Sequence, residues 1–203
     1  MRVFDSSKIP PPRGFESFRA PPGFDRYALE IGAGAGWHAT VYATTHPETC
    51  LFAVEHSRAR FSRLESRARH AHLKNFLIFH ADAESFVVHC VADVSLDRVM
   101  ILYPNPYPKA SQSNKRWHEM PFMAALLSKM KAEAVLEFAT NEDSYAADFF
   151  ERMTETWGLE IIANQRISKD ADPDFKARTH FEKKYFERGE MLHLMEFRRP
   201  LSR

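Results

Sequence analysis

Apolar and polar positions along this chain of 203 residues follow two alternating patterns. Short, nearly continuous apolar runs predict buried strands at residues 27–31, 50–55, 76–79, 96–102 and 134–139. Mixed segments of helical length separate them, at 36–45, 58–73, 83–91 and 118–130. Continuous apolar strands are typical of a sheet covered on both faces, and strand–helix alternation implies parallel strands with right-handed crossovers. We therefore predict an α/β fold with helices on both faces of a mostly parallel sheet.

The last third of the chain continues this pattern. An Asn141-Glu142-Asp143 cluster can cap a helix over roughly 145–157, and two further strands are predicted at 159–163 and 191–197. Residues 1–24 differ, because five prolines and several phenylalanines punctuate them. We expect this segment to be an arm without regular structure that packs on the domain or on a partner, followed by one domain over 25–203.

Composition narrows the class of protein only slightly. Hydrophobic residues make up 44% and charged residues 27% of the chain, as in ordinary globular proteins, and the net charge is +1. Any nucleic-acid footprint must therefore be local. Cys50 and Cys90 lie in apolar surroundings and are expected to be free thiols in a reducing compartment. No signal peptide, membrane span or metal-ligand spacing is visible, so we expect a cytoplasmic protein without a metal, either a monomer or a homodimer.

Three glycines at alternate positions follow the first predicted strand. Glu30, Gly32, Gly34 and Gly36 form an E-x-G-x-G-x-G pattern before a helix, which lets the backbone approach a ligand closely. The pattern resembles motif I of class I S-adenosylmethionine (SAM) methyltransferases. Glu30 could face the positive end of such a cofactor, or it could bond backbone N–H groups of the loop.

Two more acidic residues end the next two strands. A carboxylate at Glu55 could accept both hydroxyls of a ribose, whereas the alternative is a solvated strand-end glutamate. Asp82 could accept from an adenine amino group, cap the following helix, or do both. Glu30, Gly32, Gly34, Gly36, Glu55 and Asp82 are therefore the candidate cofactor-binding residues.

The fourth predicted strand runs into Tyr103-Pro104-Asn105-Pro106-Tyr107-Pro108-Lys109. Its prolines stiffen the backbone at the carboxyl end of a strand, where parallel α/β sheets place their active sites. Lys115 and Arg116 follow in a polar loop.

With this motif the chain resembles the tRNA (guanine-N7)-methyltransferase family, whose motifs match in order from residue 28 to about 197. The matches are Leu29-Glu30-Ile31-Gly32, Val54-Glu55, Ser95-Leu96-Asp97, the proline motif, Ala139-Thr140-Asn141 and Thr179-His180-Phe181-Glu182-Lys183-Lys184. The resemblance implies a Rossmann-like, seven-stranded class I methyltransferase fold with an antiparallel C-terminal strand, SAM as cofactor and tRNA as partner. It also implies a catalytic role for Asn105 and substrate contacts from Tyr107, Lys109, Asn141, Thr179 and Glu182.

The departures from the family pattern leave alternatives open. Asn105 and Asn141 stand where the family has aspartates, and Tyr107 stands where it has tryptophan. Guanine N7 has a lone pair and needs alignment rather than a base, but an Asn amide presents the wrong partner to the guanine N1–H and amino group. Asn-Pro-Tyr-Pro also resembles the motif of exocyclic-amino methyltransferases. The alternatives are such an enzyme, or a non-catalytic protein that binds SAM or RNA.

Some of these residues also have plain structural explanations. Asn105 can stabilise a turn, and Thr179 with Glu182, in a predicted turn before the last strands, can form a capping box. Two basic segments could bind RNA phosphates or could simply be solvated. The first has Arg60, Arg63 and Arg67 on one helical face, and the second comprises Lys176, Arg178, Lys183, Lys184 and Arg188.

Overall fold

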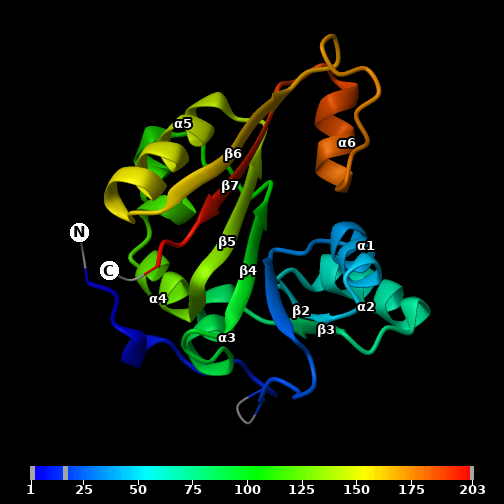
Figure 1. Ribbon diagram of the computed structural model, residues 1–203, viewed down its shortest axis with the longest axis vertical. Coiled ribbons are helices and arrows are strands. Elements are labelled where there is room, and N and C mark those ends of the chain that lie inside the picture. The colour runs from blue at the N-terminus through cyan, green and yellow to red at the C-terminus, as the bar shows by residue number, and fades with distance from the viewer. Residues whose placement is uncertain (1–2, 16–17, 202–203) are drawn as a thin grey trace.

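The computed structural model describes residues 3–15 and 18–201 and is built around one seven-stranded sheet. The strand order is β3-β2-β1-β4-β5-β7-β6, with β7 antiparallel to both of its neighbours and the first five strands parallel (Figure 1). This confirms the predicted fold. The strands are β1 (Arg26–Ile31), β2 (Thr49–Glu55), β3 (Phe76–His80), β4 (Leu96–Leu102), β5 (Met130–Thr140), β6 (Glu160–Ile167) and β7 (Leu192–Arg198).

The register of the parallel strands brings their carboxyl ends to one edge of the sheet. Ile31 at the end of β1 pairs with Val54 of β2 on one side and with Ile101 of β4 on the other. Leu102, the last residue of β4, pairs with Ala139 of β5. The glycine-rich loop and the proline motif therefore leave the sheet side by side.

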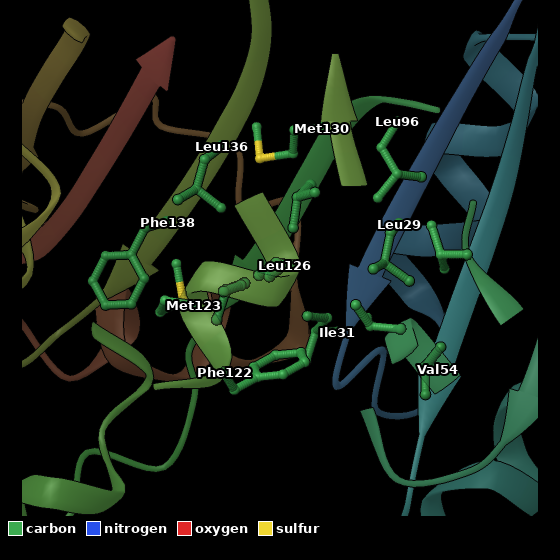
Figure 2. Packing of buried hydrophobic residues seen from close by; sticks show 14 of the residues in the cluster. Leu29, Ile31, Val54, Leu96, Phe122, Met123, Leu126, Met130, Leu136 and Phe138 are labelled. Atoms are coloured by element: carbon green, nitrogen blue, oxygen red, sulfur yellow. The ribbon is translucent and has the colours of Figure 1, made fainter. Parts of the chain in front are cut away.

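Helices cover both faces of the sheet. Figure 1 shows α3 (Ala83–Cys90), α4 (Phe122–Lys129) and α5 (Asp143–Glu151) on one face, and α1 (Trp37–Thr45), α2 (Arg58–Ala71) and α6 (His180–Glu187) on the other. Each face has its own core. Figure 2 shows the first one, where Leu29 and Ile31 of β1 and Leu136 and Phe138 of β5 meet Phe122, Met123 and Leu126 of α4.

Side-chain alternation along β1 explains how one strand serves both faces. Leu29 and Ile31 belong to the core under α3, α4 and α5, whereas Ala28 belongs to the core under α1 and α2. Successive side chains of a strand point to opposite faces, so Glu30 points to the α1 side together with Ala28. Glu30, a charged residue in an otherwise mainly apolar strand, therefore points toward α1.

The N-terminal arm packs on the domain, as one of the two expected outcomes. It has one short 3-10 helix, η1 (Ser6–Lys8), and its Phe18 ring lies 4.9 Å from the Phe79 ring, centroid to centroid. The Ser85 hydroxyl and the His89 ring bond to the carbonyls of Pro10 and Ile9, respectively. The arm therefore covers α3 and the edge of the core beneath it.

Three segments differ from the sequence prediction. The turn expected around residues 179–182 is the start of α6, with Thr179 as its N-cap. The single helix expected over 118–130 is a 3-10 turn, η3 (Trp117–Glu119), followed by α4 from Phe122, because Pro121 has no N–H for a continuous helix. The helix after β5 ends in a π-helical turn, η4 (Arg152–Thr156). Among the described residues, no helix is long and apolar enough to cross a membrane.

Candidate active site

The glycine-rich loop turns sharply at the end of β1. Gly32, Gly34 and Gly36 have φ angles of 75°, 59° and 79°, which L side chains rarely adopt. The N–H groups of Gly32 and Ala33 both bond to the Val54 carbonyl, so the loop starts as a cap on β2. A Cβ at Gly32 would meet no atom within 4 Å, so the backbone is open to a ligand there.

Glu55 holds this loop from β2. Its side chain is buried, and its Oε2 accepts a 2.9 Å hydrogen bond from the Gly34 N–H. Its Oε1 accepts a 2.7 Å bond from the Ser57 N–H. Glu55 is therefore not the solvated glutamate of the simpler alternative. Each oxygen keeps a second lone pair, so a ribose role stays a prediction.

Glu30 is paired with a residue that the sequence analysis did not consider. Its Oε2 lies 2.9 Å from Nδ1 of His38 in α1, and both side chains are buried. Burial alone would lower the pKa of His38, but the Glu30 carboxylate outweighs it, so the pKa of His38 is raised above its ordinary value of 6.5. The carboxylate thus faces neither bulk solvent nor the loop amides.

Asp82 caps α3, as one of its two expected roles. Its Oδ1 accepts from the N–H groups of Glu84 and Ser85 at 2.9 and 3.2 Å. The residue is exposed, and its Oδ2 has no hydrogen-bond partner among the described residues. One carboxylate oxygen is therefore available to a ligand while the other holds the helix.

The proline motif forms a stiff ledge, which we define as residues 103–109, beyond the end of β4. Asn105 is exposed, and its Oδ1 accepts a 3.3 Å bond from the Tyr107 N–H. This is the turn-stabilising role considered for Asn105, and it leaves the amide Nδ2 free for another partner. Both tyrosines of the ledge have positive φ angles, 52° for Tyr103 and 43° for Tyr107. Such strained backbone at a strand end is typical of functional sites.

Arg116 supports the ledge from beneath and is not part of an exposed basic loop. Its side chain is buried, its Nε donates to the Pro106 carbonyl at 2.9 Å, and its Nη1 lies 2.6 Å from Asp148 in α5. The basic loop expected from Lys115 and Arg116 thus retains only Lys115, which lies over the Tyr107 ring at 5.9 Å. The role of Arg116 as a buried support of the ledge could not be predicted from the sequence.

The start of α6 is held by a chain of ion pairs on the α1 side of the sheet. Arg178 donates from Nη1 to Glu137 of β5 at 2.5 Å and from Nη2 to Glu182 of α6 at 2.8 Å. Glu137 also pairs with Arg98 of β4 at 2.9 Å. These pairs raise the pKa of Arg178 despite burial, which by itself would lower it. They fix α6 over the ends of β4 and β5.

Thr179 and Glu182 form the capping pair that was the alternative to substrate contact. The Thr179 Oγ1 accepts from the Glu182 N–H at 2.9 Å, and Glu182, fully buried, accepts from the Arg178 N–H at 2.6 Å. The Tyr185 ring of the same helix lies 5.8 Å from the Tyr103 ring of the ledge. The motif therefore lies next to the ledge, as the resemblance implies, and its substrate role stays a prediction.

Two further substrate candidates lie at the same edge. Asn141 follows β5, and its Nδ2 donates to Glu190 at 2.7 Å. Lys109 is exposed at the far end of the ledge. In the described part of the chain, no group of three or more His, Cys, Asp or Glu side chains could hold a metal ion.

The Tyr103 hydroxyl is buried beside this network and has no hydrogen-bond partner among the described residues. Burial, with the Glu182 charge nearby, raises the pKa of Tyr103 far above its ordinary value, so the hydroxyl stays protonated. A weak indication of such a polar face is present in the sequence, where strands that are otherwise mainly apolar are interrupted by Glu30, Arg98, Glu137 and Glu196.

Comparison with known proteins places these features in a family. The family described as "Putative methyltransferase" matches residues 25–195. A protein of Methylobacillus flagellatus named tRNA (guanine-N(7)-)-methyltransferase is 32% identical over 84% of this chain and 71% of its own length. A protein of the same name from Neisseria gonorrhoeae is 29% identical over 76% of this chain, which spans only 63% of that relative. The solved structure of the 16S rRNA methyltransferase KamB superposes with a TM-score of 0.63 at 17% identity, over 87% of this chain and 89% of KamB. That likeness concerns the fold alone.

Proposed function

Because the chain belongs to the putative methyltransferase family over residues 25–195, we propose that it transfers a methyl group from SAM to N7 of a guanine in tRNA. One observation carries the proposal: the glycine-rich loop after β1 and the ledge after β4 leave adjacent strands at the same edge of the sheet. Open α/β sheets bind their ligands at that edge. A tRNA partner and a cytoplasmic location belong to the same proposal.

The residues of the glycine-rich loop fit a SAM molecule. Gly32 leaves the backbone open, Asp82 offers its free Oδ2, and Glu55 holds the loop through Gly34. When bound, SAM supplies the methyl group on a positively charged sulfur. Glu30 and His38 form a buried pair beside the loop, and the net charge of this pair becomes more negative when His38 loses its proton, which would favour a positively charged cofactor.

The ledge supplies alignment rather than proton transfer. Guanine N7 attacks with its own lone pair, so positioning alone lowers the barrier considerably. Pro104, Pro106 and Pro108 limit the motion of the ledge, and Arg116 anchors the Pro106 carbonyl. Asn105 and Tyr107 then present an amide and an aromatic face to a base.

The relatives favour guanine N7 over the exocyclic amino group as the target. The exocyclic alternative requires the Asn105 carbonyl to accept an amino hydrogen with its second lone pair, because it already accepts one bond from the Tyr107 N–H. The Asn105 amide that remains free is a donor, which suits the guanine O6 acceptor next to N7.

Mass spectrometry of nucleosides tests the proposal directly. The full-length protein is incubated with SAM and unfractionated bacterial tRNA, and the RNA is digested to nucleosides. We expect 7-methylguanosine to rise, and to rise far less with Glu55→Ala, which removes the bonds to the Gly34 and Ser57 N–H groups. A rise in a nucleoside methylated on an amino group would support the exocyclic alternative. Calorimetric SAM binding without any methylated nucleoside would support a non-catalytic binding protein.

A further inference from the structure

A hollow of about 700 Å³ lies between the start of α1, the middle of α2 and the outer side of α6, and none of its lining residues was placed in the candidate active site. Figure 1 shows α6 standing above α1 on the same face of the sheet. The hollow brings together Arg67 of α2 with Lys183, Lys184 and Arg188, which are more than 110 residues away in the sequence. The two basic segments, which the sequence could not place relative to each other, thus meet at one site.

The hollow concentrates positive charge that the chain as a whole lacks. Its lining has four Lys and Arg side chains, one histidine and one carboxylate, Glu187, whereas the net charge of the whole chain is +1. These cations are weakly engaged. Lys183 lies 3.8 Å from Glu187 with both side chains more than half exposed, Arg188 lies 3.6 Å from Glu190, and Lys184 contacts the Tyr185 ring. Exposed pairs at such distances add little stability, so the cations are available to an external anion.

The hollow adjoins the glycine-rich loop. The Arg67 Nε donates to the Ala35 carbonyl at 3.0 Å, between Gly34 and Gly36. Trp37, which follows Gly36 directly, contributes a half-buried aromatic ring to the lining. A ligand in the hollow would therefore sit beside the proposed cofactor loop and touch the same turn of chain.

We propose that this hollow, which we call the basic hollow, binds the phosphate backbone of the RNA substrate, with Trp37 as a stacking surface for a base. The backbone positions of Lys183 and Arg188 are about 7.5 Å apart along the helix axis, so these two side chains can reach successive phosphates of one strand. Cations combined with an aromatic ring are the usual elements of single-stranded RNA binding. The proposal rests on the proposed function, because it names the surface by which that RNA is held.

Two matched double variants test the basic hollow. Lys183→Glu with Arg188→Glu reverses two exposed cations of the lining, and Arg60→Glu with Arg63→Glu reverses two exposed cations of α2 that do not line it. Both variants change the net charge equally. Binding of fluorescently labelled, unfractionated tRNA is measured by anisotropy over a series of salt concentrations, and SAM binding is measured by calorimetry.

We expect the first variant to bind tRNA at least about tenfold more weakly at 0.1 M salt, with a salt slope lower by about two, while SAM affinity is unchanged. We expect the Arg60→Glu, Arg63→Glu variant to lose much less of its affinity for tRNA. Glu187→Gln, which removes the one carboxylate of the lining, should tighten tRNA binding. Equal losses in the two double variants would show a diffuse basic surface and would overturn the proposal, as would no loss in either.

The tRNA-binding measurements test the basic hollow independently of whether the protein transfers a methyl group. If the wild-type protein makes no methylated nucleoside but the lining variant still loses tRNA affinity selectively, the proposed function fails and the basic hollow stands. If methylation is found but the lining variant binds tRNA normally, the basic hollow fails and the proposed function stands.

Discussion

Gly36 and Leu64 are packed so closely that a Cβ at position 36 would lie 2.4 Å from the Leu64 Cδ1 and 3.4 Å from its Cα. The third glycine of the loop is therefore where α2 approaches the start of α1. Gly32 also has a positive φ angle, but a Cβ at this position would meet no atom within 4 Å. One glycine of the motif serves packing and another leaves room for a ligand.

Substitution at these two glycines should separate the two roles. We expect Gly36→Ala to lower the free energy of unfolding by roughly 2–4 kcal/mol, because backbone strain and overpacking add. Gly32→Ala should cost only about 1 kcal/mol, from strain alone, but should weaken SAM binding more. Urea unfolding and calorimetry measure the two effects. Equal losses of stability would contradict the assignment.

The Glu30–His38 pair should make stability depend on pH. The pKa of His38 is raised in the folded protein, so its charged form stabilises the fold fully below pH 6.5, and this contribution is lost as pH rises through the folded value. The wild type should thus exceed His38→Gln in unfolding free energy by about 1–2 kcal/mol near pH 6, and by less near pH 9. His70→Gln, on the exposed side of α2, is the control. A difference that grows with pH would refute the pairing.

Asn105→Asp should increase guanine methylation. The new carboxylate can still accept the Tyr107 N–H, and its second oxygen can accept from guanine N1–H and the amino group, which the Asn amide cannot do. A pair of this kind gives about 1–3 kcal/mol of discrimination, so we expect roughly a tenfold gain. Incorporation of tritiated methyl groups into unfractionated tRNA measures it, with Asn105→Ala as the control. No gain would argue against the family's base contact in this protein.

Arg116→Lys should reduce turnover without abolishing SAM binding. A lysine cannot bond both the Pro106 carbonyl and Asp148, so the ledge loses its anchor. Small misplacements of reacting groups are costly, and we expect kcat/KM to fall by about tenfold or more. Lys115→Ala, which changes the exposed neighbour, should have little effect on stability. If Arg116→Lys leaves the rate unchanged, the ledge is held by its prolines alone.

The sheet could be predicted because strand identity rests on local apolar runs. The strand predicted over 96–102 is observed as β4 (Leu96–Leu102), and the first three start within a residue of their observed starts. The helix α6 could not be predicted because it has only eight residues, and its aromatic side chains pack on Tyr103 and Phe175, whose positions the sequence does not give. Short amphipathic helices draw most of their stability from such packing.

The sequence predicted which residues belong to the candidate site, but it did not predict the contacts that these residues make. Glu30 and Glu55 lie at the carboxyl ends of β1 and β2 and Asp82 follows β3, as expected, because strand ends follow from apolar patterning. The partners of these residues could not be predicted in the same way, because His38 contacts Glu30 only when α1 packs on the sheet in its observed orientation. Arg116 looked like part of a solvated loop, and only the packing of α5 beneath the ledge shows that it is buried.

The arm has a consequence for how the chain folds. Phe15 and Phe18 are synthesised before their ring partners, which are Phe52, Phe79 and Phe86. The Pro10 carbonyl likewise accepts a hydrogen bond from the hydroxyl of Ser85, which lies 75 residues later in the chain. Contacts this distant in sequence form slowly, so the beginning of the chain must remain unattached on the ribosome until α3 has emerged. The arm thus reaches its native place only after the residues that it covers have been synthesised.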